Sequence, residues 1–202
     1  MIDLYHSAGT RSLRCLWALE ELGVAYQLHS LPFPPRLKAP EFLQINPAGT
    51  LPFMVDGDTR MSESGAILQY LDSRYGEGEL SVEPASAEFG NFLEFLHFGE
   101  ASLAMPQSVV LRYQYFMPKE LRQPAVAKDY QEMVLGRLPR LEQQLAGRDY
   151  LCGEFSLADI SVGYALILGE TFGVSEHYPE GVKAYLSRLK ERAALQRALE
   201  KK

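Results

Sequence analysis

The sequence predicts a chain of two parts, an α/β part with the order β-α-β-α-β-β-α followed by an all-helical part. Strand and helix signals alternate over the first 78 residues, and helical periodicity alone continues after them. The stretch GEGELSVEP between the two patterns is typical of a linker. We therefore predict domains at 1–78 and 85–202, joined by a linker at 79–84.

The elements of the first part follow from periodicity and from start and stop signals. Gly23 and Gly76 each follow a helical pattern, Asp56–Gly57 is a hairpin signal, and Ser62 or Ser64 can cap a helix. The predicted elements are a strand at 2–6, a helix at 11–23, a strand at 24–33, a short helix around 40–45, strands at 51–58 and 59–62, and a helix at 62–76.

The second part contains four helical patterns. A Phe-rich segment spans 85–105, and a long helix is expected from about 128 to 145 with one apolar face formed by Met133, Val134, Leu138, Leu141 and Leu145. The nearly all-apolar segment 156–170 is expected to be buried, and Ser156 with Asp159 predicts a capping box at its start. The segment 183–202 is predicted to close the chain as a single amphipathic helix.

Composition disfavours several classes of partner. The 202 residues are 47% hydrophobic and 23% charged, and the net charge of −6 disfavours nucleic acid and anionic membranes as partners. No apolar run approaches the ~20 residues that a membrane span needs. The N-terminus lacks a basic region followed by an apolar stretch, so no secretory signal is predicted. We expect a cytoplasmic protein that binds neither nucleic acid nor membrane.

The cysteines and histidines predict neither a disulfide framework nor a metal site. The two cysteines, Cys15 and Cys152, are far apart in sequence and form no C-x-x-C motif. The four histidines, at 6, 29, 97 and 177, have no metal-ligand spacing, so no metal is expected. Cys15 lies among apolar residues of a predicted helix, which favours a buried structural cysteine.

The stretch INPAGTLPFMVDG, residues 45–57, contains a proline where a strand is expected to begin. Pro52 has no N–H to donate to a sheet, which is typical of an edge or a special turn. Glu63 and Ser64 follow at the start of a predicted helix, where free N–H groups and the helix dipole attract carboxylates. The alternative is that Glu63 and Ser64 merely cap that helix.

These features together resemble the cytosolic glutathione transferase family, and the resemblance covers essentially the whole chain. The matching stretches are RSLRCLWALEELG, APEFLQINPAGTLPFMVDGDTRMSESGAILQYL and YLCGEFSLADISVGYAL. The middle one combines N-P-x-G-x-L-P with E-S-x-A-I at the spacing of the family. The resemblance implies a thioredoxin-like N-terminal domain, a helical C-terminal domain and a homodimer.

The resemblance also implies a set of glutathione ligands. Pro52 is expected to be cis, so that the backbone of Leu51 can pair with the cysteinyl backbone of the tripeptide as an added strand would. Ser64 would hold the γ-glutamyl carboxylate, and Glu63 would pair with the ammonium group. Thr50 and Lys38 could reach the glycyl carboxylate, although Lys38 could equally be a solvated loop residue.

Activation of the glutathione thiol needs a hydrogen-bond donor, because a reference pKa of about 8.5 leaves little thiolate at neutral pH. The candidate hydroxyls are Tyr5, Ser7, Thr10 and Ser12. In serine-type relatives the hydroxyl stands just before R-S-x-R on the first helix, and Thr10 occupies that position here. Threonine adds a methyl group and stiffens χ1. We predict Thr10 first and Ser7 second, with the alternative that Thr10 is only the N-cap.

The second substrate would contact the helical part. The region that matches the electrophile pocket of the family is rich in aromatic residues and methionine, from which we select Met105, Tyr113 and Phe116. The alternative is that these side chains form the core. The predicted function is conjugation of reduced glutathione, as co-substrate, to a hydrophobic electrophile. Two alternatives are glutathione-dependent reduction of disulfides or peroxides, and a non-catalytic binding module with the same fold.

Overall fold

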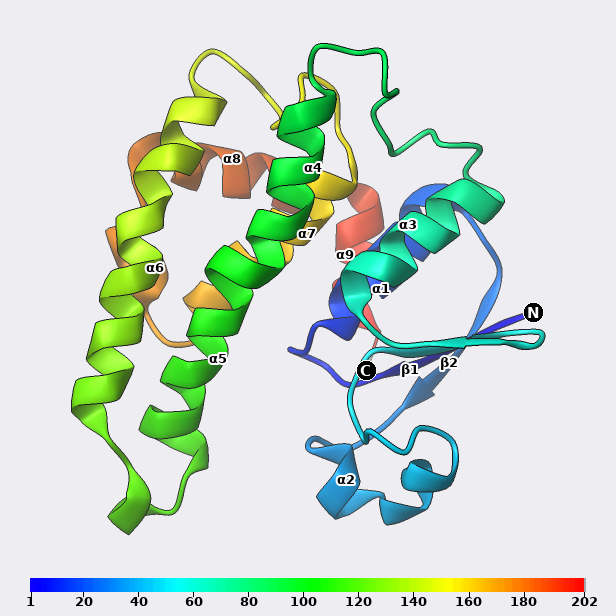
Figure 1. Cartoon of the computed structure of the whole chain (residues 1–202), viewed down its shortest axis with the longest axis vertical. Coiled ribbons are helices and arrows are strands. Elements are labelled where there is room, and N and C mark those ends of the chain that lie inside the picture. The colour runs from blue at the N-terminus through cyan, green and yellow to red at the C-terminus, as the bar shows by residue number, and fades with distance from the viewer. Residues whose placement is uncertain (202) are drawn as a thin grey trace. The chain divides into compact units, whose positions relative to one another are not determined.

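The computed structural model describes residues 1–201, which form two compact units (Figure 1). The first unit consists of Met1–Ser81 together with the residues from Glu191 onward, and the second is Val82–Lys190. The division after Ser81 falls within the predicted linker at 79–84. The residues from Glu191 onward group with the first unit, whereas the sequence placed them at the end of a domain spanning 85–202.

A four-stranded sheet with the order β2-β1-β3-β4 forms the centre of the first unit. The strands are β1 (Ile2–His6), β2 (Tyr26–Ser30), β3 (Phe53–Asp56) and β4 (Thr59–Met61). β1 and β2 are parallel, and β3 is antiparallel to both β1 and β4. The predicted hairpin is confirmed, with Gly57 in the turn at a φ of 58°. The strands predicted at 24–33 and 51–58 are shorter than expected, since pairing is restricted to their middle residues.

Helices cover both faces of this sheet. Figure 1 shows α1 (Ser12–Leu22) and α3 (Ser64–Tyr75) on one side, and α2 (Pro35–Lys38) on the other. The 3-10 helix η1 (Pro40–Gln44) follows α2, so the segment expected to hold one short helix contains two. α1 is buried on nearly all sides from Ser12 to Leu19, rather than along one face as its apolar pattern predicted.

Alternation along β1 assigns its side chains to these two faces. Ile2, Leu4 and His6 are buried, and Tyr5 lies between them on the opposite face. The ring of Tyr5 packs 5.2 Å from that of Phe42 in η1. Because His6 contacts a side chain of α1, the face with His6 is the one that α1 covers.

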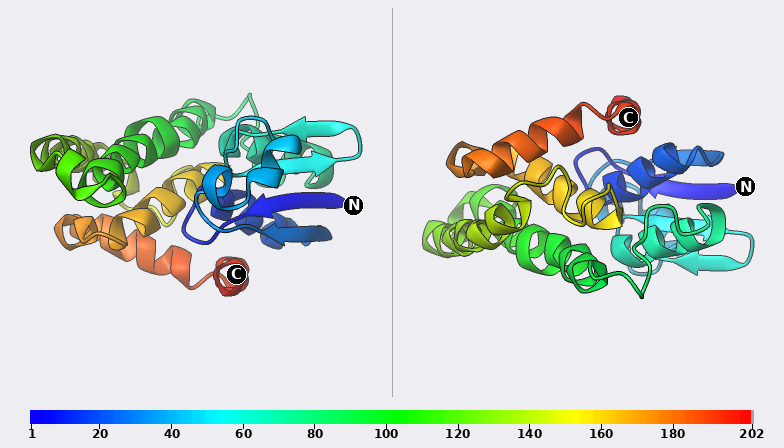
Figure 2. Two further views of the ribbon diagram at one scale, coloured as in Figure 1. Left: turned by 90° about the horizontal axis from the view of Figure 1, so that it is seen from below. Right: turned by 90° about the horizontal axis from the view of Figure 1, so that it is seen from above.

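The predicted closing helix is wrong, because the structure divides 183–202 between two helices. These are α8 (Glu180–Lys190) and α9 (Ala193–Glu200). At the break, Arg192 forms a bidentate ion pair with Glu21 of α1 at 2.7 and 2.9 Å. Arg197 pairs with Glu20 at 2.7 Å, and α9 packs along α1 in the first unit (Figure 2). Contacts with α1 that are distant in sequence therefore interrupt a local helical pattern.

Among the residues that the structure describes, the regular elements of the second unit are all helices. Its first segment is a nearly continuous helix with two π-helical stretches. The elements are α4 (Phe89–His97), η2 (Phe98–Ala104), α5 (Met105–Leu111), η3 (Arg112–Phe116), η4 (Lys119–Leu121), α6 (Pro124–Leu145), α7 (Leu157–Glu170), η5 (Val174–His177) and α8.

The long helix α6 begins earlier than the predicted residue 128, with Pro124 in its first turn. Met133 is 38% exposed, so its assignment to the apolar face is wrong. Val134, Leu138, Leu141 and Leu145 are buried as predicted.

α7 is the central helix of the second unit and is buried along most of its length, as predicted. Gly99 of η2 packs so closely on α7 that an added Cβ would lie 2.4 Å from the Ser161 hydroxyl. The capping box predicted from Ser156 and Asp159 is confirmed. Asp159 also accepts hydrogen bonds from the Leu151 N–H and the Tyr185 hydroxyl, and its burial raises its pKa.

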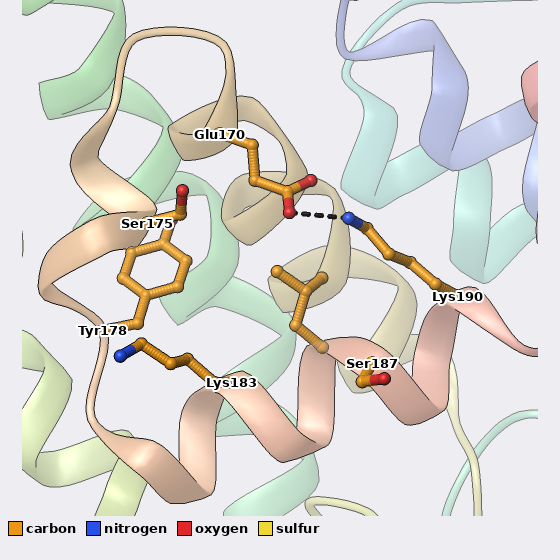
Figure 3. Close-up of a pocket in the computed structure, with 7 residues that line it drawn as sticks. Glu170, Ser175, Tyr178, Lys183, Ser187 and Lys190 are labelled. Carbon is orange, nitrogen blue, oxygen red and sulfur yellow. Dashed lines mark hydrogen bonds and ion pairs between the residues drawn. The ribbon is translucent and has the colours of Figure 1, made fainter.

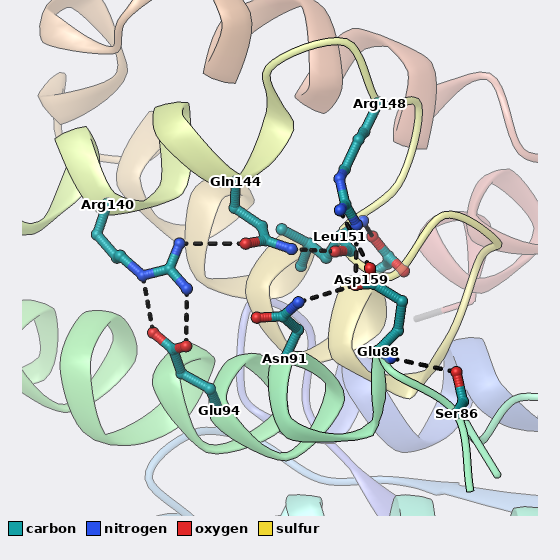
Figure 4. A network of polar contacts seen from close by, with 9 residues as sticks. All are labelled: Ser86, Glu88, Asn91, Glu94, Arg140, Gln144, Arg148, Leu151 and Asp159. Carbon is teal, nitrogen blue, oxygen red and sulfur yellow. Dashed lines mark hydrogen bonds and ion pairs between the residues drawn. The ribbon is translucent and has the colours of Figure 1, made fainter.

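A polar network links α4, α6 and the start of α7 (Figure 4). Arg148 forms a bidentate pair with Glu88 at 2.8 and 3.1 Å, and Arg140 does the same with Glu94 at 3.0 and 2.8 Å. Arg140 also donates to Gln144. Bidentate geometry makes these pairs more specific than ordinary surface ion pairs.

None of the helices in residues 1–201 combines the length and the apolar character that a membrane span requires.

Candidate glutathione site

Three loops of the first unit meet at one end of its sheet, where β1 and β4 finish and β3 begins. Tyr5 pairs with Phe53, so the chain leaving β1 lies beside the chain entering β3. Met54 pairs with Met61, so the chain leaving β4 toward α3 lies at the same end of the sheet. The register therefore gathers the predicted residues around Thr10, Leu51 and Ser64, which are far apart in sequence.

The peptide bond between Leu51 and Pro52 is cis, as the resemblance implied. Pro52 is buried, and β3 begins after it at Phe53. Among the described residues, the backbone of Leu51 has no hydrogen-bond partner. An N–H and a C=O are therefore left available just before β3 begins, as needed for pairing with an extended peptide.

Asn46 shapes the loop before Leu51, and its individual role was not predicted. Its buried side chain donates to the Thr50 carbonyl at 2.9 Å and accepts from the Ala48 N–H at 3.1 Å. Gly49 has a φ of 60°, and an added Cβ would lie 2.9 Å from Arg36 Cβ. The side chain of Thr50 is exposed. The N-P-x-G spacing could have identified this turn, because asparagine commonly bonds to backbone two residues ahead.

Glu63 is the N-cap of α3 and has an unusual backbone conformation, with φ 71° and ψ 101°. Positive φ is strained for a residue with a side chain, and such strain tends to occur at functional sites. The side chain of Glu63 is exposed and makes no capping hydrogen bond. The predicted capping by Ser62 or Ser64 is therefore wrong, and nothing in the sequence indicated the strain.

Ser64 is the first residue of α3 and is buried, with an exposure of 4%. Its hydroxyl accepts a hydrogen bond from Nη1 of Arg14, a fully buried residue of α1, at 3.1 Å. Cys15 is also buried, with its sulfur 4.0 Å from the Ser64 carbonyl oxygen, and burial raises the pKa of its thiol. The expectation of a buried Cys15 is confirmed. The role of Arg14 was not predicted.

Two of the candidate hydroxyls, those of Thr10 and Ser12, meet at the start of α1, and Ser7 contacts them through its backbone. The Thr10 hydroxyl donates to the Ser7 carbonyl at 2.7 Å and lies 2.7 Å from the Ser12 hydroxyl. Ser12 in turn lies 2.9 Å from Nδ1 of His6 and accepts from the Ser7 N–H at 3.3 Å. The N-cap of α1 is Arg11, so the alternative role of Thr10 as the N-cap is wrong.

Tyr5 lies apart from this cluster, because its ring stacks on His29 on the opposite face of the sheet. His6 is buried, with its pKa lowered by burial to about 4, so its ring is neutral near pH 7. Nε2 of His6 has no hydrogen-bond partner among the described residues. Sequence reasoning considered His6 solely as a metal ligand and missed its contact with Ser12.

The remaining predicted residues lie elsewhere. Lys38 is exposed at the end of α2. In the second unit, Met105 is the first residue of α5 and Phe116 the last of η3, with exposures of 50% and 63%. Tyr113 in η3 is half-buried, beneath the guanidinium of Arg112 at 6.0 Å from its ring centre. Because their side chains are exposed, the alternative that Met105 and Phe116 belong to the hydrophobic core is wrong.

A cavity of about 250 Å³ in the second unit contains none of the predicted residues (Figure 3). The ion pair between Glu170 and Lys190, at 2.6 Å, crosses its upper part. Within residues 1–201 there is no group of three or more His, Cys, Asp or Glu placed to hold a metal ion.

Comparisons with known proteins identify the class to which this fold and site belong. The model of the glutathione S-transferase N-terminal domain matches residues 4–79. Glutathione S-transferase 1 of Zea mays is 32% identical over 192 residues, which cover 91% of this chain and 88% of the relative. The chain therefore belongs to the glutathione S-transferase family.

Two solved structures support the same conclusion. A sphingomonad glutathione S-transferase complexed with glutathione has a TM-score of 0.83 at 27% identity, with 98% of this chain and 97% of that chain covered. A glutathione transferase from Pseudomonas putida with one glutathione disulfide bound per subunit has a TM-score of 0.84 at 27% identity. That match covers 98% of this chain and 90% of the other. The predicted thioredoxin-like sheet with a helical second part is confirmed.

Proposed function

We propose that this protein is a glutathione transferase that binds reduced glutathione, stabilises its thiolate and conjugates it to a hydrophobic electrophile. The observation that carries the proposal is the convergence of three loops at one end of the strands, where the Leu51 backbone has no partner among the described residues. Relatives that are named for this activity, or that contain glutathione or its disulfide, support it.

The tripeptide would lie beside the loop that leads into β3. The N–H and C=O of Leu51 pair with its cysteinyl backbone, and the cis bond to Pro52 belongs to the same loop. The γ-glutamyl carboxylate binds the free N–H groups at the start of α3 and the hydroxyl of Ser64. Glu63 pairs with the ammonium group, and Thr50 and Lys38 bind the glycyl carboxylate.

Thr10 donates a hydrogen bond to the glutathione sulfur in this proposal, and Ser7 is the second candidate. Thr10 is partly exposed in the loop between β1 and α1, so its hydroxyl can turn from the Ser7 carbonyl toward a ligand. A donor placed at the developing thiolate lowers the thiol pKa, because the hydrogen bond strengthens when the sulfur becomes charged.

The proposal also covers the second substrate, the oligomeric state and the cellular location. Met105, Tyr113 and Phe116 contact the hydrophobic electrophile, and the exposure of Met105 and Phe116 leaves their apolar surface available. The protein acts in the cytoplasm as a homodimer, without a metal and without binding nucleic acid or membrane.

Calorimetry with glutathione is the first test. We expect saturable binding at millimolar or lower ligand, and an affinity about tenfold weaker when Ser64 is replaced by alanine. Absence of binding by the wild-type protein would refute the proposal. Turnover is then measured with aryl halides, isothiocyanates and hydroperoxides, so that conjugation and reduction are distinguished by the product.

A comparison of Thr10→Ala and Ser7→Ala identifies the activating hydroxyl. Loss of conjugation in Thr10→Ala but not in Ser7→Ala supports the proposed donor, and the reverse result assigns the role to Ser7. If the wild type and both variants bind glutathione but show the same background rate with every electrophile, the protein is a non-catalytic binding module.

A further inference from the structure

We propose that His6 and Ser12 are positioning residues that form a one-way chain of hydrogen bonds, from His6 to Ser12 to Thr10, whose final proton is free to turn toward the glutathione sulfur. The proposal rests on the role of Thr10 as thiolate donor under the proposed function. It adds two residues that contact no substrate and act through Thr10.

The first step is the position of the proton on His6. Its Nδ1 lies 2.9 Å from the Ser12 hydroxyl, whereas its Nε2 is buried without a partner in residues 1–201. A neutral imidazole has its proton on one of the two nitrogens. A proton on Nε2 would create an orphaned buried N–H group, which is rare in native proteins. The proton therefore lies on Nδ1, and His6 donates to Ser12.

The second step is the direction of the Ser12 hydroxyl. Its oxygen accepts from Nδ1 of His6 and from the Ser7 N–H at 3.3 Å, which uses both of its lone pairs. Ser12 therefore cannot accept from Thr10. The Ser7 carbonyl, 3.4 Å away, already accepts the Thr10 hydroxyl and the Thr10 N–H. The proton of Ser12 is thus directed to the Thr10 oxygen, 2.7 Å away.

The third step is the freedom of the Thr10 proton. Because Thr10 accepts from Ser12, its own proton must point elsewhere, and it reaches the Ser7 carbonyl at 2.7 Å. Rotation about the bond between Cβ and Oγ1 can move this proton to a ligand without displacing a heavy atom. Each donor in such a chain polarises the next one, so a bound thiolate would meet a stronger donor than an isolated threonine. Ser12 itself has no proton to offer the sulfur.

The first test measures the pKa of glutathione bound to the full-length protein from its ultraviolet thiolate absorbance. We expect Ser12→Ala to raise the pKa of the bound thiol by about one unit. At a pH below that pKa, the thiolate fraction should then be about tenfold lower than in the wild type. His6→Leu should have the same effect. His6→Asn should recover much of the lost thiolate, because the amide can donate from near the position of Nδ1. The surface variant Ser86→Ala is the control and should match the wild type.

Two comparisons distinguish loss of the hydrogen-bond chain from general damage to the site. S-methylglutathione has no thiol proton, so Ser12→Ala should bind it within about twofold of the wild type. In a double-mutant cycle, Ser12→Ala should have no further effect on the thiol pKa once Thr10 is alanine. If the wild type lowers the thiol pKa and Ser12→Ala lowers it equally, the chain is disproved while the proposed function stands.

The position of the proton on the His6 ring tests the hydrogen-bond chain in the absence of any ligand. Nitrogen NMR of the free protein should show a protonated Nδ1 and an unprotonated Nε2 near pH 7. A proton on Nε2 or a charged ring would overturn the proposal. If the wild type binds no glutathione, the proposed function fails, and the role proposed for the chain fails with it whatever the tautomer.

Discussion

The fully buried guanidinium of Arg14 in α1 donates a hydrogen bond of 3.1 Å to the hydroxyl of Ser64 at the start of α3. This bond joins two helices across a sequence separation of 50 residues. It fixes the hydroxyl that we assign to the γ-glutamyl carboxylate, and it brings a cation next to that position. Both effects favour an anion at the N-terminus of α3.

Ser64→Ala should weaken both folding and glutathione binding. It removes one hydrogen bond to a buried charged group, which contributes about 1.5–3 kcal/mol to stability. The loss of a contact to the ligand should weaken affinity about tenfold, equivalent to about 1.4 kcal/mol. Denaturant unfolding and calorimetry measure the two effects. Ser73→Ala, at an exposed position of the same helix, is the control, and equal behaviour of the two variants would contradict the prediction.

Glu63→Gly should separate backbone strain from ligand binding. Glycine accepts a φ of 71° without strain, so this variant should be about 1 kcal/mol more stable than Glu63→Ala, which keeps the strain. Both variants lack the carboxylate and should bind glutathione more weakly than the wild type. Glu77 also has positive φ, at 53°, and is exposed, so Glu77→Gly should leave binding intact. Normal glutathione affinity of Glu63→Gly would argue against a role for its carboxylate.

His6 should make stability fall in mild acid. Its pKa is about 4 in the folded protein and 6.5 without burial, so the unfolded chain binds more protons between these values. Stability should therefore decrease as the pH falls from 6.5 to about 4, by about 3 kcal/mol in total from this residue. Urea unfolding at several pH values measures this slope. The variant His6→Asn, which has no titrating ring, should lose that part of the slope, and an unchanged slope would show that other groups cause it.

Gly49→Ala should destabilise the loop before Leu51. The added Cβ would lie 2.9 Å from atoms of Arg36 and Leu43, at a φ of 60° that disfavours a side chain. We expect a loss of about 2 kcal/mol in unfolding free energy, together with weaker glutathione binding. Gly136→Ala on the exposed side of α6 has open space around it and should instead stabilise the protein by up to about 1 kcal/mol. Similar effects of the two substitutions would contradict the close contact at Gly49.

Local patterns in the sequence determined most elements of this protein. Apolar periodicity identified α1, α3, α6 and α7, because a helix that packs on a core must repeat apolar residues along its buried side. The capping box of Ser156 and Asp159 and the hairpin at Gly57 are local contacts, so short motifs were sufficient to predict them. The segment around Leu51 and Pro52 identified the family through its spacing.

Tertiary structure decided what the local patterns left open. Three side-chain contacts join residues that no local motif connects. They are Arg14 with Ser64, His6 with Ser12, and Arg192 with Glu21, the last of which divides the closing helix. A hydroxyl or guanidinium bonds to whichever partner the fold places within about 3 Å. The sequence therefore determined which groups are available for chemistry, and the packing of α1 on the sheet and on α3 decided which of them meet.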